Sequence, residues 1–170
     1  DLYPREGKDQ HAFCLHVDRR TDDVRVLSNN APTEMWMGTM LHEFGHAVYD
    51  KYLGDDLPFV LREPAHMLAT EAVAMLMGRM SKAPDFLSTF NENKSLVTRA
   101  TNQLADQERL SMLIMARWVP VMVHFERALY EDPGQDLNRI WWELVEKYQQ
   151  TKMPEGREGA SDWATKTHLV

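Results

Sequence analysis

The spacing of apolar and polar residues predicts one strand-like region, near the start of the chain. Residues 11–18 and 24–28 interleave apolar with polar side chains, which is the period of a half-buried strand. The five residues between them are charged or polar and are typical of a turn. We therefore predict a β-hairpin, followed by a break at residues 29–32.

Helical spacing dominates the rest of the chain. A first helix is predicted from about Pro32 to Leu53, because proline suits a first helical turn and Gly54 supplies a stop. After a turn, a second helix is predicted from about Pro64 to Met80. Its apolar positions recur every three or four residues and predict a buried face made of Ala65, Leu68, Ala72, Met75 and Leu76.

Residues 81–94 are predicted to form a connecting loop that contains a short helix at 85–90. Helical spacing resumes over residues 95–130, but Pro120 supplies no backbone donor. We therefore expect a kink or split near Trp118, which gives either two helices or one bent helix. A last helix is predicted over residues 137–150, before a polar, irregular tail. The pattern as a whole predicts one mainly α domain over residues 1–170, with a small sheet at its front.

The composition of the chain excludes several classes of protein. The chain has 170 residues, 44% of them hydrophobic, and a net charge of −7, which argues against a nucleic-acid partner. No apolar run approaches the roughly eighteen residues of a membrane span. Cys14 is the single cysteine, so no internal disulfide framework is expected, and a reducing, cytoplasmic location fits. The start has neither an initiator methionine nor a signal peptide, so we expect a piece of a longer protein.

The first predicted helix carries the sequence His42-Glu43-Phe44-Gly45-His46, an HExxH pattern. Two histidines four residues apart lie on one helical face, so their imidazoles can converge on one metal ion. Glu43 then points into the same site. This arrangement is typical of zinc-dependent hydrolases.

A hydrolytic zinc ion takes three protein ligands and one water molecule, so one ligand must come from elsewhere. Glu71 is favoured, because its helix returns antiparallel to the first and because small or apolar residues flank it. Glu63 competes, but its place at the start of that helix suits the positive end of the helix dipole. His66 lies near Glu71 and is more readily explained as a structural or solvated residue.

Zinc lowers the pKa of a bound water molecule from near 15.7 to about 7. Glu43 could then take a proton from that water, deliver hydroxide to a peptide carbonyl and pass the proton to the leaving amine. A donor for the tetrahedral oxyanion is still required.

At these residues the chain resembles gluzincin metallopeptidases, and two families share the resemblance. The N-terminal part resembles the thimet-oligopeptidase family in residues 1–8, His11-Ala12 and the HExxH sequence. The remainder resembles the peptidyl-dipeptidase A (angiotensin-converting enzyme) family. The matching segments are Asp56-Leu57-Pro58, Leu61-Arg62, Glu71-Ala72, Trp141-Trp142-x-Leu144, Lys147-Tyr148-Gln149 and Lys166-Thr167-His168.

The resemblance implies a zincin-like helical fold with the small sheet at the edge of a cleft, and Glu71 as third zinc ligand. It implies that His168 holds the substrate carbonyl or oxyanion and that Lys166 pairs with a peptide's C-terminal carboxylate. His11 and Ala12 would lie on a strand whose backbone pairs with an extended peptide.

Two departures from the families stand out. Met75 replaces an aspartate that orients a zinc histidine in the second family. The catalytic tyrosine of both families would fall beyond Val170.

The sequence therefore predicts a zinc metallopeptidase acting on oligopeptides, with catalytic Glu43 and metal ligands His42, His46 and Glu71. Release of C-terminal dipeptides and internal cleavage of short peptides both stay open. A non-catalytic zinc-binding module is the alternative of a different class, although such a module needs no base. Self-association, or association with a missing part of the chain, is expected because apolar side chains of the two site helices would be left uncovered.

Overall fold

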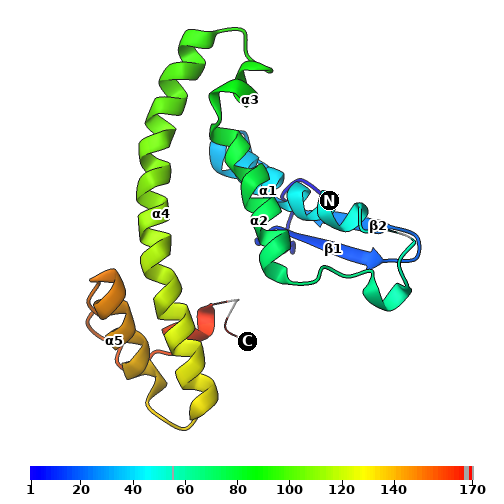
Figure 1. Ribbon diagram of the computed structural model, residues 1–170. Coiled ribbons are helices and arrows are strands. Elements are labelled where there is room, and N and C mark those ends of the chain that lie inside the picture. Colours follow the sequence, from blue (N-terminus) through cyan, green and yellow to red (C-terminus); the bar gives the residue numbers. More distant parts are fainter. Residues whose placement is uncertain (55, 167–168, 170) are drawn as a thin grey trace. The chain divides into compact units, whose positions relative to one another are not determined.

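The computed structural model describes residues 1–54, 56–166 and 169, and the chain divides into two compact units, Asp1–Leu104 and Ala105–Val170 (Figure 1). The described chain is mainly helical with one two-stranded antiparallel sheet, which confirms the predicted fold class at that level. Within the described ranges, no helix combines the length and apolar character needed to cross a membrane.

The predicted hairpin is present in the first unit. Strand β1 (Phe13–Asp18) pairs antiparallel with β2 (Asp23–Leu27), with Phe13 opposite Leu27. Leu15 and Val17 are exposed, so alternation turns Cys14 and His16 to the other face of β1. The prediction that His11 and Ala12 belong to the strand is wrong, because β1 begins at Phe13, two residues after the predicted start.

A buried lysine ties the N-terminal segment to the end of the hairpin. The Lys8 ammonium donates to the carbonyl oxygens of Asp1 at 3.0 Å and Tyr3 at 2.8 Å, and also to that of Ser28. Three carbonyls and the Asp1 carboxylate at 3.2 Å satisfy the ammonium where water cannot reach it.

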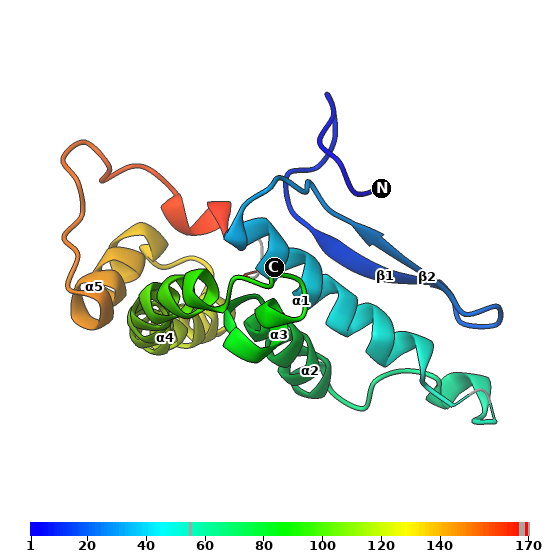
Figure 2. The same ribbon diagram turned by 90° about the horizontal axis from the view of Figure 1, so that it is seen from above.

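Helix α1 (Glu34–Lys51) lies along the hairpin in the first unit (Figure 2). Thr33 caps its start, since the Thr33 hydroxyl accepts from the Trp36 backbone N–H at 3.3 Å. Helix α1 is two residues shorter at each end than predicted. Its buried residues are Glu43 and Gly45, so a carboxylate and a glycine occupy positions where a helix normally buries apolar side chains.

The second unit is built on the C-terminal part of α4 (Lys94–Glu131), with α5 (Leu137–Gln149) and a 3-10 turn η3 (Asp162–Thr165). Pro120 lies inside α4, so the alternative of two separate helices is wrong. Proline has no backbone N–H, so α4 loses one backbone hydrogen bond at this position. The residues that follow Pro120 in α4, among them Val121 and Phe125, still pack in the core of the unit. The unit's core consists of Val121, Phe125, Trp141, Val145 and Leu169.

Helix α2 (Met67–Arg79) packs on α1 and is followed by η2 (Met80–Lys82) and the short α3 (Pro84–Ser88). It begins three residues later than predicted. The predicted buried face is also wrong, since Leu68, Met75 and Leu76 are exposed. The buried positions of α2 are instead Thr70 and Ala74, and Ser81 of η2 continues this row of small buried side chains.

Small residues allow the backbones of α1 and α2 to approach closely. A Cβ built on Gly45 would lie 2.6 Å from the Cα of Ala74, and one on Gly78 would lie 3.4 Å from the Cβ of His42. At the far end of the pair, the Ser81 hydroxyl donates to the Glu34 carboxylate at 3.0 Å. These contacts run in opposite directions along the two helices, which confirms the predicted antiparallel return.

Gly45→Ala is expected to destabilise the first unit, although alanine normally favours a helix over glycine by about 0.5–1 kcal/mol. The added methyl would meet backbone at 2.6 Å, and such overpacking costs on the order of 1–3 kcal/mol. Thermal unfolding measures the difference. Gly159→Ala is the matched control, because a Cβ added at this position would have no atom within 4 Å. An unchanged or raised melting temperature for Gly45→Ala would show that the helices are not in close contact.

Candidate metal centre

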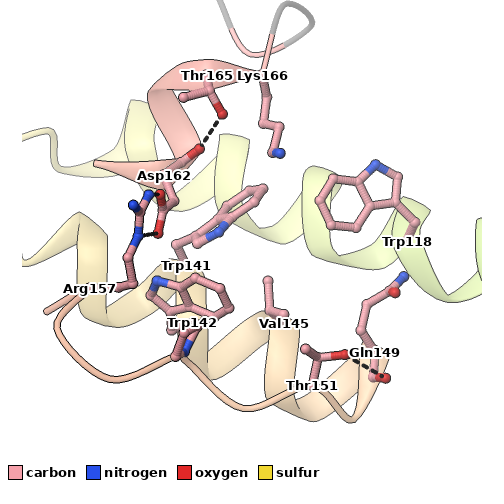
Figure 3. Close-up of a pocket in the computed structure, with 11 residues that line it drawn as sticks. Trp118, Trp141, Trp142, Val145, Gln149, Thr151, Arg157, Asp162, Thr165 and Lys166 are labelled. Carbon is pink, nitrogen blue, oxygen red and sulfur yellow. Dashed lines mark hydrogen bonds and ion pairs between the residues drawn. The ribbon is translucent and has the colours of Figure 1, made fainter. Parts of the chain in front are cut away.

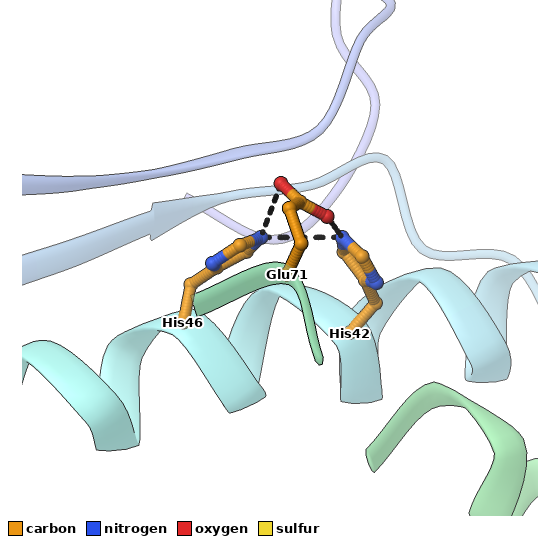
Figure 4. Close-up of side chains that lie close together, drawn as sticks. All are labelled: His42, His46 and Glu71. Carbon is orange, nitrogen blue, oxygen red and sulfur yellow. Dashed lines mark hydrogen bonds and ion pairs between the residues drawn. The ribbon is translucent and has the colours of Figure 1, made fainter. Parts of the chain in front are cut away.

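His42, His46 and Glu71 converge on one point between α1 and α2 (Figure 4). The Nε2 atoms of His42 and His46 are 3.2 Å apart. The Glu71 carboxylate places Oε2 3.6 Å from Nε2 of His42 and Oε1 3.4 Å from Nε2 of His46. One nitrogen from each imidazole and the carboxylate oxygens therefore face a common centre.

These separations suit a tetrahedral metal ion. Zinc binds imidazole nitrogen and carboxylate oxygen at about 2.0–2.2 Å, and ligands at tetrahedral angles are then about 3.3–3.6 Å apart. The observed spacings of 3.2, 3.4 and 3.6 Å lie at or next to that range. Two imidazoles and one carboxylate also match the donor set of hydrolytic zinc sites. The residues present therefore fit such an ion.

The cluster is open on one side. The side chain of His46 is 17% exposed and that of His42 is 29% exposed, whereas Glu71 is 46% exposed. Glu71 is therefore half-buried, although small or apolar residues flank it in the sequence. Solvent, and hence a ligand, can approach the three donors past Glu71.

Glu43 is buried, at 7% exposure, and is not one of the converging donors. Its charge acts on Cys14 of β1, so the carboxylate lies on the side of α1 that faces the hairpin. Asp50, two turns later on α1, acts on the same thiol. Burial, together with the Asp50 and Glu43 carboxylates, raises the pKa of Cys14 to about 11.

The competing candidates for the third ligand lie elsewhere. Glu63 forms an ion pair with Arg19 of the hairpin turn and stands outside α2, so its predicted place at the helix start is wrong. His66 caps α2, with its Nδ1 accepting from the Leu68 backbone N–H at 3.0 Å. In the described part of the chain, His42, His46 and Glu71 are the one group whose donors converge in this way.

His11 and Ala12 immediately precede β1. The His11 ring is exposed, and its Nδ1 lies 2.6 Å from the Ala12 carbonyl oxygen. Ala12 is buried at 5% exposure. Their predicted role in pairing with a peptide backbone stays a prediction.

Lys166 belongs to the second unit, where its ammonium lies 5.7 Å from the ring centroid of Trp118 and 5.9 Å from that of Trp141. These three side chains help to line a pocket of about 560 Å³, on whose wall Arg157 pairs with Asp162 (Figure 3). An ammonium over indole faces is a favourable cation–π arrangement. Pairing of Lys166 with a peptide carboxylate stays a prediction, and His168 lies outside the described residues.

The comparisons with known proteins give no relative, since no protein-family model, curated protein or solved structure matches this chain.

One contributor to the site was not recognised from the sequence. Gly45 was noted only as part of the HExxH pattern, although it sets the separation of the two helices.

The raised pKa predicts that Cys14 is a slow nucleophile. A thiol of ordinary pKa, near 8.5, is about one quarter thiolate at pH 8, whereas a pKa of about 11 leaves on the order of one molecule in a thousand. Alkylation by iodoacetamide at pH 8 should therefore be at least roughly 100-fold slower in the folded protein than in guanidinium. Equal rates in the two states would contradict the raised pKa, and with it the burial of this thiol beside Asp50 and Glu43.

Proposed function

We propose that this chain is the catalytic part of a zinc-dependent metallopeptidase that hydrolyses oligopeptides, with a zincin-like site. The observation that carries the proposal is the convergence of His42, His46 and Glu71 at tetrahedral spacing, with Glu43 next to His42 on the same helix. His42 and His46 would hold the ion through Nε2, and Glu71 through its carboxylate.

A bound zinc ion would polarise a water molecule and a substrate carbonyl, so that both react at neutral pH. Glu43 would accept the proton of that water at its carboxylate and later donate it to the leaving amine. Its position beneath the hairpin keeps the carboxylate from solvent, where a base is effective because water does not compete for its hydrogen bonds.

A purely structural zinc site is the competing function. Structural sites are closed by four protein ligands, whereas hydrolytic sites keep one position for water. Three donors converge in the described chain, and the side next to Glu71 is open. Both features favour catalysis. Between release of C-terminal dipeptides and internal cleavage, Lys166 favours the former, because an ammonium can bind a terminal carboxylate.

The first test of the proposal is the metal itself. The protein should bind one zinc ion per chain, and His46→Ala or Glu71→Gln should weaken binding on the order of 100-fold or more, because each removes one of three ligands. Chelator competition measures the affinity. Glu63→Gln is the matched control and should bind zinc like the parent, since Glu63 pairs with Arg19. Equal loss in Glu63→Gln and Glu71→Gln would contradict the assigned ligand set.

The second test concerns the proposed base. Glu43→Gln keeps the shape of the side chain and removes its basicity, so peptide turnover should fall on the order of 100-fold or more while zinc affinity stays near that of the parent. Hydrolysis of a fluorogenic peptide library by the zinc-loaded protein gives the rates. The control is Glu92→Gln, an exposed glutamate in the loop before α4. Near-parental turnover in Glu43→Gln would exclude Glu43 as the base.

A further inference from the structure

The first unit contains a cavity that shares no residue with the proposed metal centre. Its volume is about 440 Å³, and it lies beside the N-terminal half of α1. The segment before α1, η2, α3 and the N-terminal part of α4 supply the rest of its wall, and all lining residues belong to the first unit. A cavity of this size can enclose a small molecule.

The wall of this cavity is mainly apolar. The apolar side chains that line it include Pro32, Trp36, Met37, Met40, Leu87 and Leu104. Hydrogen bonds hold one part of this wall in place, since Asn30 donates from Nδ2 to the Met40 sulfur at 3.3 Å and accepts the Ser28 hydroxyl at Oδ1 at 2.6 Å. A wall that is ordered before a ligand arrives lowers the entropic cost of binding.

Glu34 supplies the cavity with a carboxylate. The buried hydroxyl of Ser81, which also lines the cavity, donates to Oε1 of Glu34 at 3.0 Å. The Lys82 ammonium lies 3.8 Å from the same oxygen, beyond hydrogen-bond distance. Oε2 accepts no hydrogen bond from the part of the chain that the structure describes. Glu34 therefore keeps an acceptor to which a cation can bind.

A ligand ammonium can replace the interaction between Glu34 and Lys82. The two side chains are 35% and 28% exposed, and an ion pair between groups so accessible to water contributes little. A ligand ammonium at hydrogen-bond distance from Glu34 would form a charge-assisted bond, which is stronger than a neutral one. A ligand carboxylate would be repelled by the same residue. The charge in the cavity therefore favours a cation over an anion.

We propose that this cavity binds a small apolar amine. Its ammonium pairs with Glu34, and its alkyl or aryl group packs against Trp36, Met37 and Met40. An apolar wall with one well-placed polar group is the usual composition of a small-molecule site. The cavity contains no metal ligand, so the amine should bind to the zinc-free protein, and the inference does not depend on the proposed peptidase activity.

The charge preference of the parent protein is the first test. The probe is 4-phenylbutylamine, a cation at neutral pH, and the matched probes are 4-phenylbutyrate and 4-phenylbutanol, which carry the same apolar body. The amine should bind saturably with a dissociation constant on the order of 1 mM, and the acid at least about tenfold more weakly. Equal affinity for the amine and the acid would overturn the inference. Equal affinity for the amine and the alcohol would also overturn it, because the cavity would then accept any apolar group, including a side chain of a protein partner.

Methionine methyl NMR signals locate the bound probe. The signals of Met37 and Met40, assigned with Met37→Leu and Met40→Leu, should shift and saturate at the same amine concentration. Met67 and Met112 are exposed outside the cavity, at 76% and 52%, and their signals should stay in place. Comparable shifts at all four methionines would show general binding to apolar surface and would contradict a defined site.

Substitution of the carboxylate is the second test. Glu34→Gln should bind the amine about tenfold more weakly and lose the preference for the amine over the alcohol, because the charge is gone. Its amide oxygen can still accept the Ser81 hydroxyl, which preserves the local packing. Asp85→Asn is the matched control, since it removes the same charge from an exposed residue of α3 outside the cavity. Parental amine affinity in Glu34→Gln would exclude Glu34 as the partner.

Removal of the competing ammonium gives a result in the opposite direction. Lys82→Gln should bind the amine severalfold more tightly than the parent, because Glu34 no longer has a second cation at 3.8 Å. A gain in affinity cannot come from a damaged fold, so this variant keeps the inference testable if Glu34→Gln proves unstable. Unchanged or weaker binding of the amine by folded Lys82→Gln would contradict the assigned pairing.

Discussion

Close contact between two helix backbones is the constraint on which the proposed site depends. Gly45 and Ala74 leave no room for a larger side chain between α1 and α2, and a Cβ added at Gly78 would lie 3.3 Å from the carbonyl oxygen of Gly38, which is also a tight approach. Donor atoms on separate helices must meet within a few tenths of an ångström for a metal to bind, because ligand distances are short and fixed. A helix pair separated by leucine-sized side chains would place Glu71 several ångströms away.

The packing of α1 shows a second consequence of this geometry. One face of the helix is used for close contact with α2, and the face beneath the hairpin carries Glu43 and Asp50, near Cys14. Burying carboxylates costs free energy unless they gain compensating partners, so this polar layer is poor for stability. Functional sites are the places where such an arrangement is retained.

The second unit follows ordinary packing rules. Its core is formed by aromatic and branched side chains from α4 and α5 together with Leu169, and Phe125 lies edge-on to Trp141 at 5.1 Å between ring centroids. Aromatic pairs prefer this geometry, which places the positive ring edge against a negative ring face. The indole surfaces that remain accessible line the pocket where Lys166 lies.

The sequence alone determined the elements whose signals are local. The HExxH spacing placed His42 and His46 on one helix face, and the short turn after α1 implied an antiparallel return that would bring Glu71 beside them. Helix α5 was predicted to within one residue, because polar breaks flank a strong amphipathic pattern. Tertiary structure decided what depends on partners. The buried face of α2 is small rather than apolar because Gly45 brings the helices together, and Pro120 stays inside α4 because packing after it outweighs one lost hydrogen bond. The surroundings of Glu43 and Asp50 likewise depend on the hairpin, which no spacing along α1 could reveal.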